Sequence, residues 1–264
     1  MTSTKPVTFV LVPGSFVTPA ENDKLAAALE QKGYTVNHIE LLTANDGTRQ
    51  PPATMADDTT HIRSEISSIL DNDNRNVVLV LHSYAGIPGN NALSGLNTAD
   101  RAAAGKDTSV VGILFIGSFL PMAGESLRDI LTSDLAPGEH IQEPYKSGMP
   151  GEYLPAIPAE FAPFVFNDLV DQAEVAKYHG LMVRHASDSY GAKATYTAWK
   201  DIHSVYMIPE RDVILPVVVQ EAMYERAISE GGKVKRVFVE GVGHCVNISR
   251  PEVVVKELEA ITGL

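Results

Sequence analysis

Short apolar runs recur along the chain and alternate with segments of helical period. The four clear runs and, after them, the two weaker ones are Val7–Val12, Val77–Leu81, Val110–Ile116, Ser204–Ile208, Thr35–Glu40 and Val234–Val239. Continuous apolar runs without alternation are typical of strands buried on both faces, and helices between such strands are typical of a parallel sheet. The pattern therefore predicts an α/β fold in which helices cover a parallel sheet.

The segments between these runs each carry one apolar face. Residues 19–31 have helical spacing, and Gly33 follows as a left-handed C-terminal cap. Residues 57–70 repeat apolar side chains at the same spacing. Near the C-terminus, Ser249 and Glu252 fit the S-x-x-E capping box, which predicts that a helix begins there.

Residues 119–200 do not show this alternation of apolar runs and helical segments. The segment is rich in proline and holds ten of the 18 aromatic side chains of the chain. An irregular, aromatic-rich insertion over a parallel sheet is typical of a lid that forms one wall of a pocket. We expect residues 1–118 and 201–264 to form the core domain and residues 119–200 to form a helical cap. A packing subdomain without a ligand role is the alternative.

The composition narrows the classes of partner. With 33 acidic and 21 basic residues the net charge is −12, which repels nucleic acids and anionic membranes. No apolar stretch reaches the roughly 18 residues of a membrane span, and the N-terminus lacks the long apolar core of a signal peptide. Cys245 is the only cysteine, which excludes an internal disulfide and a zinc-ligand cluster. We expect a cytoplasmic protein that binds a small molecule and no metal; a homodimer is left open.

A serine follows the apolar run at residues 77–81. In His-Ser-Tyr-Ala-Gly, residues 82–86, the predicted strand leads at once into a serine, small residues and a helical stretch. Such a turn projects the serine from the carboxyl end of the sheet, beside free N–H groups at a helix N-terminus. Leu81 and Ala85 replace the glycines of the G-x-S-x-G motif, so the neighbouring helix must leave room for Leu81. Ser83 is the candidate nucleophile; the alternative is that it only caps the helix.

His244 lies in a glycine-rich loop after the last predicted strand, where a general base would reach that serine. The carboxylate that orients the histidine should follow the preceding strand. Glu210 and Asp212 both qualify by position, and we favour Asp212 because it precedes an apolar stretch that would place it at the sheet edge. The order serine, acid, histidine along the chain is the one expected for such a nucleophile turn.

The loop after the first strand, Val-Pro-Gly-Ser-Phe at residues 12–16, supplies a further element. We expect the N–H groups of Ser15 and Tyr84 to form a two-donor oxyanion hole beside Ser83. By itself the loop is weak evidence for an oxyanion hole, because many strand-to-helix loops contain a glycine. It supports the prediction only together with Ser83, Asp212 and His244.

Together these motifs resemble the α/β-hydrolase superfamily, and within it the small-esterase branch that includes salicylate-type methylesterases and hydroxynitrile lyases. The resemblance covers nearly the whole chain and rests on residues 11–15, 82–86, 118–121, 210–220 and 241–252. It implies the α/β-hydrolase fold, with a six-stranded, mostly parallel sheet, a helical cap between the fourth and fifth strands, and no cofactor.

Several positions depart from this branch. Pro13 stands where relatives usually have histidine, and Asn22 where many have tryptophan, so the pocket shape of the relatives is not transferable. Hydroxynitrile lyases of this branch carry a lysine after the catalytic histidine and a threonine at the position of Gly14. This chain has Cys245 and Gly14 instead, which disfavours lyase activity.

The resemblance and the motifs together predict a serine hydrolase that cleaves a small, largely apolar carboxylic ester or lactone through an acyl-enzyme. Hydrolysis of a C–C bond by the same triad, and a non-catalytic small-ligand receptor, are the alternatives. The residues expected to line the substrate pocket are Phe16, Phe119, Phe161, Phe164, Phe166, Trp199 and Cys245.

Overall fold

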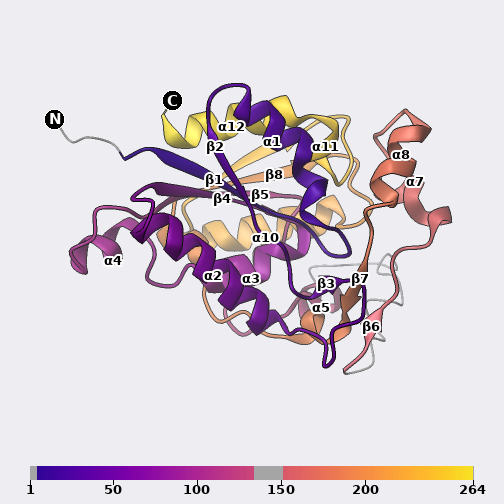
Figure 1. Ribbon diagram of the computed structural model, residues 1–264, viewed down its shortest axis with the longest axis horizontal. Helices are drawn as coiled ribbons and strands as arrows, with labels where there is room; N and C mark the ends of the chain where they lie inside the picture. Colours follow the sequence, from indigo (N-terminus) through magenta and orange to yellow (C-terminus); the bar gives the residue numbers. More distant parts are fainter. Residues whose placement is uncertain (1–4, 134–150, 264) are drawn as a thin grey trace.

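A six-stranded sheet runs through the middle of the computed structural model, which describes residues 5–133 and 151–263 (Figure 1). The strand order is β2-β1-β4-β5-β8-β9, and every neighbouring pair is parallel. The bounds are β1 Val7–Val12, β2 Thr35–His38, β4 Asn76–His82, β5 Val110–Ile116, β8 Ser204–Pro209 and β9 Val234–Val239. The predicted parallel sheet is confirmed, and its carboxyl ends lie on one edge of the molecule.

Helices cover both faces of this sheet (Figure 1). On one face lie α1 (Asp23–Glu30), α11 (Val246–Ser249) and α12 (Pro251–Thr262); on the other lie α2 (Met55–Asp71), α3 (Gly86–Ala92) and α10 (Val217–Ser229). The shorter helices are α4 (Thr98–Ala103), α5 (Leu127–Thr132), α7 (Ala162–Val165), α8 (Gln172–His179) and α9 (Ala198–Asp201), with 3-10 turns η1 (Pro19–Asn22), η2 (Ser83–Ala85), η3 (Ala159–Phe161) and η4 (Ser187–Gly191).

The sheet separates two hydrophobic cores, and strands such as β1 contribute side chains to both. In β1, Phe9 and Leu11 pack into the cluster that includes residues of α1 and α12, whereas Val10 and Val12 pack into the cluster on the α2 side. Alternate side chains of a strand point to opposite faces, so a continuous apolar run is required when both faces are covered. In the described ranges, no helix combines the length and the apolar character needed to cross a bilayer.

The described parts of the insertion, residues 119–133 and 151–200, hold short helices and also two strands that the sequence did not predict. β6 (Tyr153–Leu154) and β7 (Arg184–Ala186) pair antiparallel, and β7 pairs with β3 (Ala44–Asn45) from outside the insertion. Strands of two or three residues are too short to give a period-2 pattern, so the predicted helical cap did not include them.

The C-terminal helix forms as predicted, but its capping box does not. Ser249 is the last residue of α11, and Arg250 takes the N-cap position of α12 without a side-chain cap. Because a helical turn already ends at Ser249, its hydroxyl donates back to the Cys245 carbonyl at 3.4 Å and is not available as a cap. The predicted left-handed cap after α1 is present, with φ 83° at Gly33.

Candidate active site

Ser83 lies on a strained turn at the carboxyl end of β4. Its φ of 53° falls in the left-handed region, which costs a residue with a side chain about 1–2 kcal/mol. Two groups hold the turn: the hydroxyl of Ser118 donates to the Ser83 carbonyl at 2.7 Å, and the Phe119 N–H donates to the same oxygen at 3.3 Å. The turn therefore keeps the geometry of a nucleophile elbow even though both motif glycines are replaced.

Asp212 and His244 form a buried pair at the same edge of the sheet. His244 Nδ1 lies 2.8 Å from Asp212 Oδ2, which also accepts from Gln220 Nε2 at 2.9 Å. The other carboxylate oxygen accepts from the N–H groups of Ile214 and Leu215, at 2.9 and 2.8 Å. With donors at both of its oxygens, the carboxylate is placed to accept a hydrogen bond from the Nδ1–H of the imidazole. His244 Nε2 is then left as the unprotonated nitrogen, which is the state a general base needs.

Glu210, the second candidate acid, contacts the histidine loop elsewhere. Its Oε2 accepts from the N–H of Gly241 at 2.7 Å, so the structure places Asp212, and not Glu210, against His244. Gly117 was missed from sequence. A Cβ there would lie 3.1 Å from Asp212 Oδ2 and 3.2 Å from His244 Nδ1, so a side chain at this position, directly after β5, would crowd the pair.

The loop after β1 lies directly against the serine. A Cβ on Gly14 would come within 3.2 Å of the Ser83 Cβ. The Gly14 N–H is already bonded to a carboxylate oxygen of Glu21 at 3.2 Å. Within the described ranges, the N–H groups of Ser15 and Tyr84 donate to no other group, which leaves them as the two candidate donors for an oxyanion.

Two of the predicted pocket residues lie next to these donors. Phe16 follows Ser15 with φ 64°, is buried, and packs against His185 and Tyr190 with ring centroids 5.4 and 6.4 Å apart. Phe119 is buried and holds the Ser83 carbonyl through its N–H. The buried aromatic cluster around Phe16 thus combines the loop after β1 with β7 and η4.

The structure distributes the other predicted pocket residues differently. Phe166 and Cys245 are buried together in a small cluster under α7 and α8. Trp199 is fully buried in the main core, where its indole N–H donates to the Pro121 carbonyl at 3.1 Å. In the described part of the chain, Phe161 and Phe164 pack against each other at the surface, with 48% and 59% of each residue exposed. Their role in substrate binding stays a prediction.

The buried thiol of Cys245 lies close to two other donor atoms. A ligand atom from each of Glu21, His82 and Cys245 lies within 4.8 Å of the others. Burial and then the nearby carboxylates of Glu21, Asp168 and Asp212 raise the pKa of the thiol well above its usual value. The thiol therefore stays protonated, and the proximity of the first two residues is accounted for by their direct hydrogen bonds.

A second buried carboxylate supports the residue after the nucleophile. Asp58, on α2, accepts from the Tyr84 hydroxyl at 3.2 Å and from both the N–H and the hydroxyl of Thr43, at 3.0 and 2.6 Å. Burial raises the pKa of Asp58 to about 6, against the hydrogen bonds, which lower it. Sequence analysis missed this network because its members lie on three separate segments.

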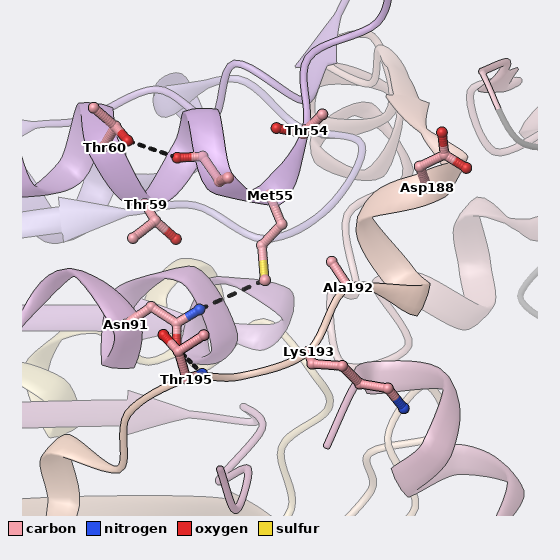
Figure 2. A pocket seen from close by; sticks show the side chains of 10 residues that line it. Thr54, Met55, Thr59, Thr60, Asn91, Asp188, Ala192, Lys193 and Thr195 are labelled. Atoms are coloured by element: carbon pink, nitrogen blue, oxygen red, sulfur yellow. Dashed lines mark hydrogen bonds between the residues drawn. The ribbon is translucent and has the colours of Figure 1, made fainter. Parts of the chain in front are cut away.

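A hollow of about 460 Å³ opens between the start of α2 and the segment after η4 (Figure 2). The side chain of Asn91 crosses its floor, donating to the Met55 sulfur at 3.9 Å and accepting from the Thr195 N–H at 2.7 Å. The lining residues are Thr54, Met55, Ala56, Thr59, Thr60, Asn91, Asp188, Ala192, Lys193 and Thr195. Ser83, Asp212 and His244 are not among them, so this hollow is distinct from the candidate active site.

A parallel sheet with a strained serine after one strand and an Asp–His pair on the loops after two later strands is the arrangement of an α/β hydrolase. Comparison with known proteins agrees: the sequence model of the alpha/beta hydrolase family matches residues 9–257, so the chain belongs to this family. Among curated proteins, it is 30% identical over 250 residues to "Probable hydrolase R7" of a Phoma species, covering 94% of this chain and 95% of that protein. It is 25% identical over 256 residues to alpha/beta hydrolase nvfD of Aspergillus novofumigatus, covering 96% of each.

Solved structures show the same fold at lower identity. A pyrethroid hydrolase from Sphingobium faniae JZ-2 superposes with a TM-score of 0.71 at 21% identity, over 97% of this chain and 98% of that chain. A polyneuridine aldehyde esterase variant superposes with a TM-score of 0.72 at 20% identity, over 98% of this chain and 100% of that chain. The predicted family and fold are confirmed.

Proposed function

We propose that this protein is a serine hydrolase that cleaves a small, largely apolar carboxylic ester or lactone through an acyl-enzyme on Ser83. The observation that carries the proposal is the 2.8 Å contact between His244 Nδ1 and Asp212 Oδ2. The other hydrogen bonds of this carboxylate, at both of its oxygens, all come from N–H donors. This contact favours the tautomer in which His244 Nε2 can take a proton, and the family placement supports Ser83 as the source of that proton.

The reaction proceeds in two half-reactions. His244 Nε2 removes the Ser83 hydroxyl proton as the serine oxygen bonds to the substrate carbonyl carbon, and the carbonyl oxygen takes the negative charge. The N–H groups of Ser15 and Tyr84 stabilise that oxyanion. The imidazolium of His244 then protonates the leaving alcohol as the C–O bond breaks. In the second half, His244 Nε2 takes a proton from a water molecule as the water oxygen bonds to the acyl carbon; the bond from that carbon to the Ser83 oxygen then breaks, the imidazolium returns the proton to Ser83, and the acid is released.

The uncharged rings packed near Ser83 support an uncharged substrate. Phe16 and Tyr84 are buried next to the nucleophile turn, and the ring of His185 packs against both, with centroids 5.4 and 4.9 Å away. Burial lowers the pKa of His185 to about 3, so the ring is neutral near pH 7. Relatives of the same fold are named as a pyrethroid hydrolase and an aldehyde esterase, which agrees with ester chemistry at such a site.

Turnover of p-nitrophenyl acetate and butyrate tests the proposal, with Ser83→Ala as the control. The proposal predicts multiple turnovers by the wild type and a loss of several orders of magnitude in kcat for the variant. Binding of the ester without turnover would contradict it and favour a receptor. Cyanide release from mandelonitrile that depends on Ser83 would instead indicate a lyase, which the residues Gly14 and Cys245 disfavour.

A further inference from the structure

A second acid–imidazole pair lies beneath the candidate active site. Glu21, from η1, and His82, the last residue of β4, are each only 3% exposed at the side chain. His82 Nδ1 lies 3.0 Å from one carboxylate oxygen of Glu21 and 3.1 Å from the other. The two residues are 61 positions apart in the chain, and no motif in the sequence pairs them.

The partners of the His82 ring indicate its protonation state. Nε2 lies 3.2 Å from the carbonyl oxygen of His244, and a carbonyl oxygen only accepts, so Nε2 carries a proton. Nδ1 faces both oxygens of Glu21 at nearly equal distances, as an N–H does when it points between the oxygens of an ionised carboxylate. The Gly14 N–H donates to one of these oxygens as well, at 3.2 Å. Both ring nitrogens are therefore donors, which makes His82 an imidazolium.

The charges on the two groups support each other. Burial by itself would raise the pKa of Glu21 and lower that of His82, because it disfavours both charged forms. The facing opposite charge and the hydrogen bonds outweigh burial, so the pKa of Glu21 is lowered and that of His82 is raised. His185 is the contrast within the same protein, because it is equally buried, faces no carboxylate, and stays neutral.

We propose that Glu21 and His82 form a buried carboxylate–imidazolium pair that positions the catalytic loops. The pair bonds the loop after β1 through the Gly14 N–H and the base loop through the His244 carbonyl, while His82 itself precedes Ser83. One cluster thus connects the oxyanion loop, the nucleophile turn and the general base. This inference rests on the proposed function, since it assigns the pair a role in that reaction.

Other titratable groups face the pair. The His244 ring lies 4.7 Å from the His82 ring between centroids, and Asp212 adds a field that favours the charged imidazole. The Cys245 thiol is close to both members and protonated. The carboxylates of Glu21 and Asp212 both favour the charged imidazole. They therefore raise the pKa of His82 above the ordinary histidine value of about 6.5.

Histidine ¹⁵N NMR of the wild-type protein tests the charge. The inference predicts that both His82 ring nitrogens are protonated at pH 7, where the His185 ring gives a neutral signature. A neutral His82 ring at pH 7 would overturn the inference. This measurement does not depend on any variant folding.

Kinetics of Glu21→Gln test the positioning role. The amide keeps the size of the side chain and the acceptor for Gly14, but it leaves His82 neutral, so a purely structural role predicts little change. We expect kcat to fall about tenfold with KM within about twofold, as slight misplacement of catalytic groups does. Glu21→Ala, which also removes the bond to Gly14, should lower kcat about 100-fold. Glu257→Gln, which breaks the ion pair of Glu257 on α12 with the half-exposed Lys235 on β9, is the control and should leave kcat unchanged.

Labelling by a fluorophosphonate separates this inference from the proposed function. A wild type that is not labelled at Ser83 would contradict the proposed function itself. If the wild type is labelled at Ser83 and a folded Glu21→Gln variant has a kcat within twofold of the wild-type kcat, only the positioning role would be overturned. Slowed labelling of Glu21→Gln at Ser83, with His82 now neutral by NMR, would support it.

Discussion

The side chain of Leu81 occupies the space that Gly89 leaves open on α3. A Cβ on Gly89 would lie 2.4 and 2.7 Å from the two Leu81 methyl carbons and 3.1 Å from its Cγ. Leu81 stands where the nucleophile motif usually has glycine. Here Gly89 on the helix, and not a glycine on the strand, permits the close approach of strand and helix. The strained turn at Ser83 is therefore compatible with a bulky residue two positions before it.

This relationship predicts an interaction between the two positions. Gly89→Ala should destabilise the fold by about 1–3 kcal/mol, because Leu81 is fully buried and has little room to move. Leu81→Ala should cost about 2–5 kcal/mol by leaving a cavity. The double variant should cost less than the sum, since the new methyl group fills part of that cavity. Urea unfolding of the four proteins measures the difference; additive costs would show that the two side chains are independent.

The identity of the orienting acid gives a second prediction. In Asp212→Asn the amide group would face His244 Nδ1, so the ring would carry its proton on Nε2 and could not act as a base. We expect kcat to fall roughly 10⁴-fold, as in the corresponding serine-protease variant. Glu210→Gln should lower kcat far less, because Glu210 only bonds the Gly241 N–H in the histidine loop. Steady-state kinetics on one ester decide the matter, and a reversed order of the two effects would show that the acid is misassigned.

Buried Asp58 predicts a pH-dependent stability. Its pKa is about 6 in the folded protein against an ordinary value of 3.8, so between these pH values the folded state holds a proton that the unfolded state has lost. The free energy of unfolding therefore falls as the pH rises through this window, by on the order of 3 kcal/mol, and then levels off. Asp58→Asn should abolish that fall.

Urea unfolding at pH 4.5, 5.5 and 7.5 measures this slope. The neighbouring Asp57 provides a control of opposite sign, because backbone and hydroxyl hydrogen bonds from Thr54 lower its pKa. Its contribution is present above the ordinary carboxyl pKa and is lost as the pH falls, so Asp57→Asn should differ least from wild type at low pH. Parallel stability curves for wild type and Asp58→Asn would contradict the assignment.

Much of this organisation could be predicted from the sequence, since it depends on local patterns. The apolar runs gave the six strands, and Ser83 and His244 follow strands within a few residues. Asp212 could not be separated from Glu210 by position, because only the folded loops decide which carboxylate meets the imidazole. The three-dimensional contacts place them: Asp212 faces His244, and Glu210 faces the backbone of Gly241.

The buried polar partners could not be predicted. Glu21 follows a proline at a helix start, where an acidic residue is ordinarily exposed and favoured by the helix dipole. Its burial against His82 depends on how η1 packs over β4, which no local pattern encodes. Asp58 lies on the apolar face of α2, four residues before Ile62, but its hydrogen-bond partners come from other segments and could not be predicted either. A histidine next to the nucleophile does signal that a buried partner is needed, but it does not say which residue supplies it.

Substrate charge provides a further prediction. Phe16, Tyr84 and His185 pack together as uncharged rings near the Ser83 turn, and the net charge of −12 adds a modest field against anions. A neutral aromatic or medium-chain ester should therefore have a higher kcat/KM than a matched ester with a free carboxylate. Rates for such a pair at low and high salt measure both effects. A preference for the carboxylated ester that weakens with salt would show that basic residues such as Arg128 or Arg184 govern selection.

The most direct measurement is the site of covalent labelling by a fluorophosphonate, read by intact mass and peptide mapping. The account predicts one label per chain, on Ser83, with none on Ser83→Ala and strongly slowed labelling of His244→Ala, because the serine is nucleophilic only with its base. Stoichiometric labelling of another serine, or labelling of Ser83→Ala at the wild-type rate, would contradict the assignment of Ser83 as the nucleophile.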